Sequence, residues 1–258
     1  QDADNMGEVN VKLTDAAFPF NFVSEANMEI KKIEFKNSNG EYITVFYFFL
    51  SAGNSYNLLD YTNGNTATVK SNSVPVGSYT HSRVTFNNAS VIMNGSITGV
   101  GGNSFFNFNN NAAGTHEVVC EPVLEIEDSG ESDVLIDIDV NKTFQFQSSF
   151  FGINWFHQIT NISGCAYNPT FRVCDLNRTG RISGKVTYNG ANVENAFITI
   201  TLEGNEICTH TEADGSFAFI GIKPGSYVVN AGLEDGTESD QAVTVSGTDN
   251  STCNFILN

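Results

Sequence analysis

The segment Thr211-Glu212-Ala213-Asp214-Gly215-Ser216-Phe217 contains the turn that indicates most clearly how the last third of this chain folds. Asp214-Gly215 lies between two stretches that read as strands, 207–211 and 217–220. An Asp-Gly pair in such a position predicts a β-hairpin, because the tight turn needs positive φ angles that glycine adopts without steric cost. We therefore expect two strands joined at this point.

Further turns are predicted on both sides of this segment. Asn189-Gly190 and Pro224-Gly225 are both typical turn pairs, since one supplies positive φ angles and the other combines a fixed φ with a permissive glycine. Short apolar stretches lie between and after them, at 182–186, 196–200 and 253–257. Several short strands separated by turns predict a β-sandwich.

The elements Thr-x-x-Asp-Gly-x-Phe at 211–217 and Pro-Gly-x-Tyr at 224–227 resemble the carboxypeptidase regulatory-like family in order and spacing. The resemblance covers 180–258 and implies a transthyretin-like (prealbumin-like) sandwich of about seven strands. The family is non-catalytic and recurs in secreted enzymes, surface receptors and adhesins as a spacer or docking module. The resemblance thus constrains fold and setting rather than activity.

The first two thirds of the chain are also rich in β-strand patterns. Residues 7–13 alternate apolar and polar side chains, and Asn39-Gly40 and Asn94-Gly95 mark two hairpins. In 134–140, four β-branched residues share one face and Leu135, Asp137 and Asp139 share the other. We therefore predict an all-β protein of two β-sandwich domains, with a flexible leader at 1–6, a first domain at 7–178 and a second at 179–258.

The first domain resembles a bacterial domain of unknown function found in secreted lipoproteins. Leu13-Thr14-Asp15-Ala16 is similar to the Leu-Thr-Asp-Ala-Pro signature of that family. Three further features follow in order, at 57–59, 76–80 and 136–140. Ala17-Phe18-Pro19 stands where the family has proline directly after alanine, so the first turn differs. The resemblance implies fold and export only, because no activity is established for that family.

Composition restricts the partners and the compartment. The net charge is −17 while only 16% of residues are charged, which argues against nucleic acid and anionic membrane surfaces as partners. The most apolar run, 42–50, is far shorter than the roughly 20 residues of a spanning helix. The chain begins at Gln1, and a polar leader of this kind often follows a lipidated cysteine, although an arbitrary boundary explains it equally. We expect an exported protein, either an outer-membrane lipoprotein at the cell surface or a periplasmic protein.

The five cysteines lack metal-site spacing, because none forms a Cys-x-x-Cys pair. Cys165 and Cys174 enclose a short loop, which favours a local disulfide in an oxidising compartment. Cys208 and Cys253 both lie in predicted strands and could pair, leaving Cys120 as the odd one. The alternative is that all five are small buried apolar residues.

Catalytic patterns are scarce in the sequence. The histidines lack the His-Glu-x-x-His spacing, and no Gly-x-Ser-x-Gly elbow is present. His116-Glu117 could supply a base, but a lone histidine is more often structural. Asp15 could be a nucleophile or a ligand, but in a tight turn an aspartate more often accepts hydrogen bonds from backbone amides. We therefore predict that the protein is not an enzyme.

An acidic segment is the best metal candidate. It offers five carboxylates, and calcium binds several hard oxygens. The residues are Glu125, Glu127, Asp128, Glu131 and Asp133. Because EF-hand spacing is missing, a solvated acidic hairpin tip is the preferred interpretation, and no other cofactor is expected.

An aromatic segment is the best candidate for ligand binding. Phe150, Phe151, Trp155, Phe156 and Tyr167 lie close together in sequence, and Trp155 is the only tryptophan. Flat rings beside amide side chains such as Asn154 are what sugar-binding faces use. The predicted ligand-binding residues are Asn154, Trp155, Phe156 and Tyr167. The alternative is that this segment packs over an open end of the first sandwich.

Together these observations predict a non-enzymatic bacterial surface or periplasmic protein that acts in binding or adhesion, with a glycan or another surface protein as its ligand. One alternative is an enzyme, or an enzyme-associated carbohydrate-binding module, for polysaccharide use. A second alternative is a structural spacer. The sequence leaves the ligand and the oligomeric state open.

Overall fold

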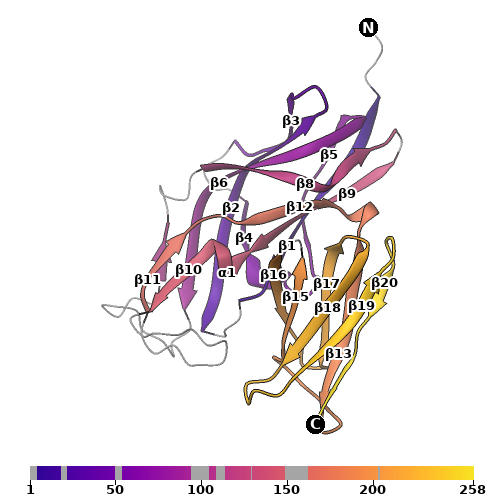
Figure 1. Cartoon of the computed structure of the whole chain (residues 1–258). Coiled ribbons are helices and arrows are strands. Elements are labelled where there is room, and N and C mark those ends of the chain that lie inside the picture. Colours follow the sequence, from indigo (N-terminus) through magenta and orange to yellow (C-terminus); the bar gives the residue numbers. More distant parts are fainter. Residues whose placement is uncertain are drawn as a thin grey trace.

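The computed structural model of this 258-residue chain describes residues 5–18, 22–49, 54–93, 105–108, 114–128, 130–148, 162–202 and 204–258. These residues are mostly β-strands, and the chain folds into two domains (Figure 1). In the described part the strands form sheets of ten, two, five and four strands. The predicted all-β class with two domains is therefore confirmed. No helix among the described residues is long and apolar enough to cross a membrane.

The first domain is built on the ten-stranded sheet. Its order is β3 (Tyr42–Tyr47), β2 (Val23–Asn37), β6 (Gly77–Met93), β8 (Gly114–Ile126), β12 (Phe171–Asp175), β9 (Glu131–Asp139), β1 (Met6–Ala16) and β5 (Ala67–Pro75), with β4 (Asn54–Asn57) beside β2 and β7 (Phe105–Asn107) beside β6. The two end strands meet, since Asn72 Nδ2 donates to the carbonyl oxygen of Val45 at 2.9 Å. The sheet therefore curls back on itself and encloses one core.

Alternation along the strands explains which face is buried. Val134, Ile136 and Ile138 of β9 are fully buried in the core, as the sequence predicts. Leu135 is also fully buried but points to the outer face of the sheet, where it approaches Gly221 of the second domain. The helix α1 (Val140–Thr143) and the strands β10 (Phe144–Ser148) and β11 (Ile162–Tyr167) follow, and η1 (Leu58–Tyr61) precedes β5.

The second domain is a sandwich of two sheets. One contains β13 (Gly180–Tyr188), β14 (Ala191–Asn192), β17 (Ser216–Ile222), β20 (Asn250–Thr252) and β21 (Phe255–Leu257). The other contains β16 (Asn205–His210), β15 (Phe197–Leu202), β18 (Gly225–Gly232) and β19 (Glu238–Val245). The turn η2 (Leu176–Arg178) lies between β12 of the first domain and β13 of the second.

The turn pairs predicted from the sequence connect strands in two different ways. Asn189-Gly190 closes a tight hairpin in which the flanking residues pair directly. Asn39-Gly40 lies in the turn between β2 and β3, where the Asn37 amide donates to the carbonyl oxygen of Glu41 at 2.9 Å, and both glycines have positive φ. Asp214-Gly215 does form a tight turn, in which the Glu212 amide donates to the carbonyl oxygen of Ser216 at 2.9 Å. The predicted hairpin is nevertheless wrong, since β16 pairs with β15 and β17 pairs with β13. This turn instead joins the two layers of the sandwich. Asn94-Gly95 lies outside the described residues.

Candidate binding face on the ten-stranded sheet

The predicted sugar-binding segment lies only partly within the described residues. Asn154, Trp155 and Phe156 fall outside them. Tyr167 lies on β11, where its ring stacks on Phe108 at 5.2 Å between centroids and packs against Phe144 at 5.5 Å. Its hydroxyl is buried and finds no partner among the described residues, and burial raises the pKa of Tyr167. Tyr167 therefore belongs to the margin of the core.

The acidic segment does not converge on one point. Asp133 forms an ion pair with Lys12 at 2.5 Å, and Asp128 accepts a hydrogen bond from Asn5 at 3.3 Å. Glu127 and Glu131 are exposed. Among the residues that the structure describes, no group of three or more His, Cys, Asp or Glu side chains is placed to hold a metal ion. Calcium binding here stays a prediction.

Both disulfides expected from the sequence are absent, because Cys120, Cys165, Cys174, Cys208 and Cys253 are all free thiols. Cys165 lies on β11 and packs against the core, whereas Cys174 lies on β12 and faces Gly221 of the second domain. Their closeness in sequence was misleading, since these two strands belong to different sheets. Cys208 lies on β16 at the domain junction, and Cys253 lies between β20 and β21.

The histidines are dispersed. The His116 ring packs on the core ring of Phe86, with 6.0 Å between the ring centroids, while Glu117 points to the outer face of the sheet. The two side chains therefore do not combine into the general base that the sequence suggested. His157 lies outside the described residues. His210 packs on Phe197 at 5.4 Å, and burial lowers its pKa to about 4. His210 is therefore a neutral structural residue at neutral pH.

We expect acid to destabilise the second domain through His210. Its unfolded pKa is 6.5 and its folded pKa is about 4, so the stabilisation is present above pH 6.5 and is lost as pH falls through this window. The difference corresponds to about 3 kcal/mol. Urea unfolding across this pH range should show a fall in the free energy of unfolding. His210→Gln should remove most of this pH-dependent fall, whereas His81→Gln should not. If the free energy of unfolding of His210→Gln fell with pH as much as that of the unchanged chain, His210 would not be the source of the acid sensitivity.

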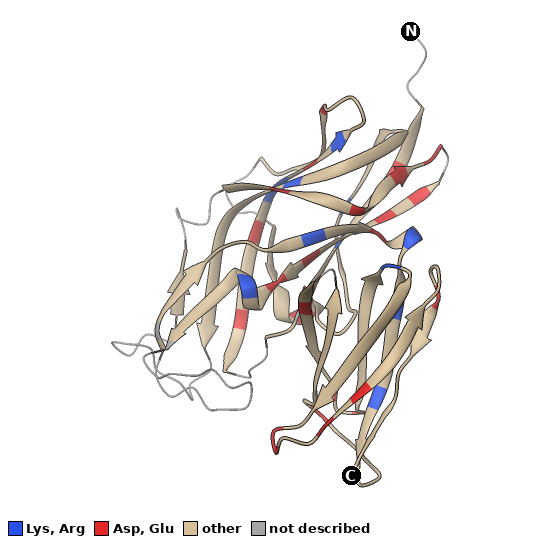
Figure 2. Cartoon of the chain, in the orientation of Figure 1, with Lys and Arg blue, Asp and Glu red and all other residues tan. Residues whose placement is uncertain are grey.

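The outer face of β3, β2, β6 and β8 carries a continuous network of charged and aromatic side chains, which we call the open face. Cross-strand register places Lys36 beside Tyr42 and His81, and places Arg83 between Glu34 and Glu117. The members of the open face are Lys32, Glu34, Lys36, Tyr42, His81, Arg83, Glu117 and Val119. Figure 2 shows that the few Lys and Arg residues of this acidic chain are spread over both domains.

Tyr42 lies at the centre of this network. The guanidinium of Arg83 stacks over its ring at 3.7 Å from the centroid, and Lys36 Nζ lies 5.5 Å from the same centroid. The Tyr42 hydroxyl donates a short hydrogen bond to Glu117. This bond raises the pKa of Tyr42 and lowers the pKa of Glu117. The ring is thus held by a cation–π contact and by a charge-assisted hydrogen bond.

Glu34 anchors the cations of the open face. It accepts from Arg83 Nε at 2.9 Å and from Lys32 Nζ at 2.6 Å. Burial alone would raise the pKa of Glu34, but the two ion pairs outweigh burial and lower it. Since Lys36 also lies 4.0 Å from Glu117, three cations and two carboxylates share one network, and three positive against two negative charges leave a net charge of +1 at neutral pH. The result is a set of hydrogen-bond donors and acceptors that are fixed in place and carry little net charge.

A cleft of about 160 Å³ lies where the open face meets the second domain. Its lining residues are Val119, Glu121, Arg172, Val173, Leu202 and Lys223. Val119 follows His81 across the strands of the open face, and Lys223 forms an ion pair with Glu121 across the domain boundary. The cleft is therefore continuous with the open face and closed on one side by the second domain.

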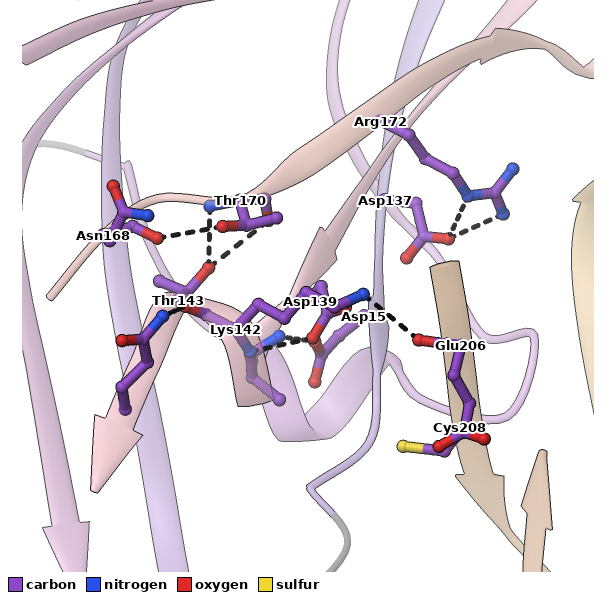
Figure 3. Close-up of polar contacts among 12 residues, drawn as sticks. Asp15, Asp137, Asp139, Lys142, Thr143, Asn168, Thr170, Arg172, Glu206 and Cys208 are labelled. Carbon is purple, nitrogen blue, oxygen red and sulfur yellow. Dashed lines mark hydrogen bonds and ion pairs between the residues drawn. The ribbon is translucent and has the colours of Figure 1, made fainter. Parts of the chain in front are cut away.

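The outer face of β12 and β9 contacts the second domain, and Figure 3 shows Arg172 beside Asp137 and Lys142 beside Glu206 in this region. Arg172 pairs with Asp137 at 2.6 Å and donates to the carbonyl oxygens of Ile220 and Gly221 at 2.9 and 2.5 Å. Nearby, the Ala17 amide donates to the carbonyl oxygen of Cys208 at 3.1 Å. These contacts join the two domains directly.

Asp15 is the unusual residue of this junction. Its Oδ1 accepts from the Val140 amide at 3.3 Å, which agrees with an aspartate that binds a backbone amide. Its Oδ2 is buried without a partner among the described residues, as is the hydroxyl of Thr209. Both residues line a cavity of about 20 Å³, room for one water molecule. Burial and the nearby Asp137 raise the pKa of Asp15 well above its ordinary value.

The open face was not predicted from the sequence, although a signal for it was present. Residues 32–36 alternate strictly, with Ile33 and Phe35 buried and the three charged residues on the other side. Such alternation predicts a half-buried strand with a polar outer face. It does not show which strands lie beside it, and the network depends on residues from four strands.

Two families match the chain, in the order that the sequence predicts. One is described as a domain of unknown function (DUF4382) and matches residues 6–150. The other is described as a carboxypeptidase regulatory-like domain and matches residues 181–258. Neither description names a catalytic activity. No curated protein matches the chain.

Several solved structures are similar to the chain at low identity. A DUF3823 family protein from Parabacteroides merdae is 13% identical, with a TM-score of 0.25, over 31% of this chain and 46% of that one. The Bacillus anthracis TIE protein is 9% identical, with a TM-score of 0.29, over 95% of this chain and 38% of that one. BcpA, the major pilin subunit of Bacillus cereus, is 12% identical, with a TM-score of 0.27, over 98% of this chain and 70% of that one. The chain thus spans less than half of the first two proteins.

Proposed function

We propose a binding role for this chain, which belongs to the DUF4382 family and carries a carboxypeptidase regulatory-like domain. In this proposal the protein is non-enzymatic and acts in capture or adhesion through the open face. The observation that carries the proposal is the network around Tyr42, in which a stacked guanidinium, two further cations and two carboxylates are fixed by one another.

The network around Tyr42 is more elaborate than the stability of a solvent-exposed sheet face requires. Exposed ion pairs contribute little to stability, with a median of roughly 0–1 kcal/mol. Stability therefore gives only a weak reason to gather three of the twelve basic residues of the chain in one network, two of them against the ring of Tyr42. Fixed donors and acceptors beside an aromatic ring are what a polar ligand needs for orientation. Binding at this face therefore accounts for the gathering of these side chains better than stability does.

The proposed setting is the bacterial cell surface or periplasm, with a lipid anchor upstream as the specific form. Support comes from the second domain, whose family recurs in secreted and surface proteins, and from the acidic composition, which keeps a surface protein soluble. Fractionation of cells that produce the natural protein, with and without globomycin to block lipoprotein processing, tests this setting. Recovery in the cytosol would contradict it.

A binding screen tests the role of the open face. The full chain is applied to an immobilised glycan array and to mucin and fibronectin, and Tyr42→Ala is applied in parallel. We expect Tyr42→Ala to weaken binding by about tenfold, since aromatic stacking is worth roughly 1–3 kcal/mol in comparable sites. Lys185→Ala, which breaks an exposed ion pair with Asp214 on the second domain, should leave binding unchanged. Binding that is insensitive to Tyr42→Ala, or no binding to any probe, would favour a structural spacer.

A further inference from the structure

Taking the proposed function as given, we infer that the ligand of the open face is an uncharged glycan chain, and that its terminal sugar unit enters the cleft beside Val119. The inference names a ligand class and a direction for the chain. It depends on three properties of the described residues: the charge balance of the open face, the kinds of side chain on it, and the wall formed by the second domain.

The charge balance selects an uncharged ligand. Lys32 and Arg83 share Glu34, and Lys36 lies beside Glu117, so each cation already has a carboxylate close by. The whole chain carries a net charge of −17, and its long-range field repels anions. A polyanion needs clustered cations whose counterions it can release. An uncharged ligand is not repelled by the net negative charge and does not need clustered cations.

The side chains favour a glycan over a protein. Protein interfaces are enriched in tyrosine and arginine but depleted of lysine and glutamate, and their buried cores hold few charges. The open face has Tyr42 stacked against Arg83, but half of its eight members are lysine or glutamate. Paired carboxylates, guanidinium and ammonium groups offer many donors and acceptors in fixed positions. Sugar hydroxyls, which both donate and accept, match such a surface.

The second domain limits how far a ligand chain can extend along the open face. A row of outer-face residues crosses the strands from Tyr42 through Lys36 and His81 to Val119, a span of about 14 Å at the usual strand spacing. Beyond Val119 the second domain covers the sheet. A ligand chain that follows this row therefore stops at the cleft.

The size and walls of the cleft fit one unit of such a chain. Its volume of about 160 Å³ is well below the roughly 300–1,000 Å³ of pockets that enclose a whole small ligand. Val119 supplies exposed apolar surface for the carbon–hydrogen face of a sugar ring, whereas Val173 and Leu202, which also line the cleft, are almost fully buried. The pair formed by Glu121 and Lys223 lies at the same cleft. The cleft is therefore suited to the chain end rather than to the chain interior.

The test uses the full chain and a matched pair of exposed valines. Val119 in the cleft is 52% exposed, and Val228 on the second domain is 58% exposed. Val119→Phe fills the cleft at an exposed strand position, where a phenylalanine is tolerated, and Val228→Phe is its control. The probes are uncharged xylo-, manno- and chito-oligosaccharides, the corresponding polymers, and heparin as a polyanion. Affinity is measured by calorimetry at about 50 and 200 mM salt, the range over which polyanion binding weakens most clearly.

We expect at least one uncharged oligosaccharide to bind with the same affinity at both salt concentrations. Val119→Phe should weaken that binding at least tenfold, with no change in melting temperature, and Val228→Phe should not weaken it. Binding that Tyr42→Ala weakens and Val119→Phe leaves unchanged would overturn the chain-end inference and keep the proposed function. Salt-sensitive binding to heparin alone, or binding to no oligosaccharide, would overturn the ligand class. Oligosaccharide binding that neither variant affects would overturn the proposed function itself.

Discussion

Gly184→Ala is expected to destabilise the second domain by about 4 kcal/mol, at the upper end of what overpacking and a lost backbone contact cause. A Cβ atom on Gly184 would lie 1.6 Å from the carbonyl oxygen of Cys253 and 2.9 Å from the ring of Phe217. Backbone atoms cannot move aside as a flexible side chain does. The amide of Cys253 also donates to the carbonyl oxygen of Ser183 at 2.8 Å, so the same change would break a hydrogen bond.

Urea unfolding of the chain, followed by circular dichroism, measures this effect. Gly190→Ala is the control, because a Cβ there meets nothing within 4 Å but has to adopt a φ of +81°. Its cost is the strain of that left-handed conformation alone, roughly 1–2 kcal/mol. If Gly184→Ala unfolds no more easily than Gly190→Ala, then close approach of the two backbone segments is not what requires glycine at position 184.

Local patterns predicted the strands well and their partners poorly. The alternation in 134–140 was enough to place Val134, Ile136 and Ile138 in the core, because side-chain direction follows directly from strand geometry. The Asp214-Gly215 turn was recognised, but its strands diverge into different sheets. Turn chemistry fixes the local backbone, whereas strand pairing depends on contacts far away in sequence.

The same limit explains the cysteines and the open face. Cys165 and Cys174 are near in sequence, yet one packs on the core and the other faces the second domain. Tyr42, Arg83 and Glu117 are far apart in sequence and meet only because the sheet order β3-β2-β6-β8 brings their strands together. A single sequence carries no information about such neighbours beyond the polar alternation of each strand.

The second large effect is expected at the domain junction. Arg172→Met should lower the free energy of unfolding by about 3–5 kcal/mol, the usual cost of removing one partner of a buried ion pair. Asp137 is only 8% exposed, so its buried carboxyl group would be left without the guanidinium that pairs with it. The carbonyl oxygens of Ile220 and Gly221 would lose their donor as well.

Two comparisons identify the source of this loss. Arg178→Met removes an exposed ion pair with Glu125 at 3.8 Å and should cost less than about 1 kcal/mol. Arg172→Met combined with Asp137→Leu should recover most of the loss, because no unpaired charge then remains buried. Cys174, whose thiol faces Gly221 across the junction, reports on opening through its rate of alkylation. We expect faster alkylation in Arg172→Met and a near-normal rate in the double variant. Equal destabilisation of the single and double variants would show that the backbone contacts of Arg172, rather than its charge, hold the domains together.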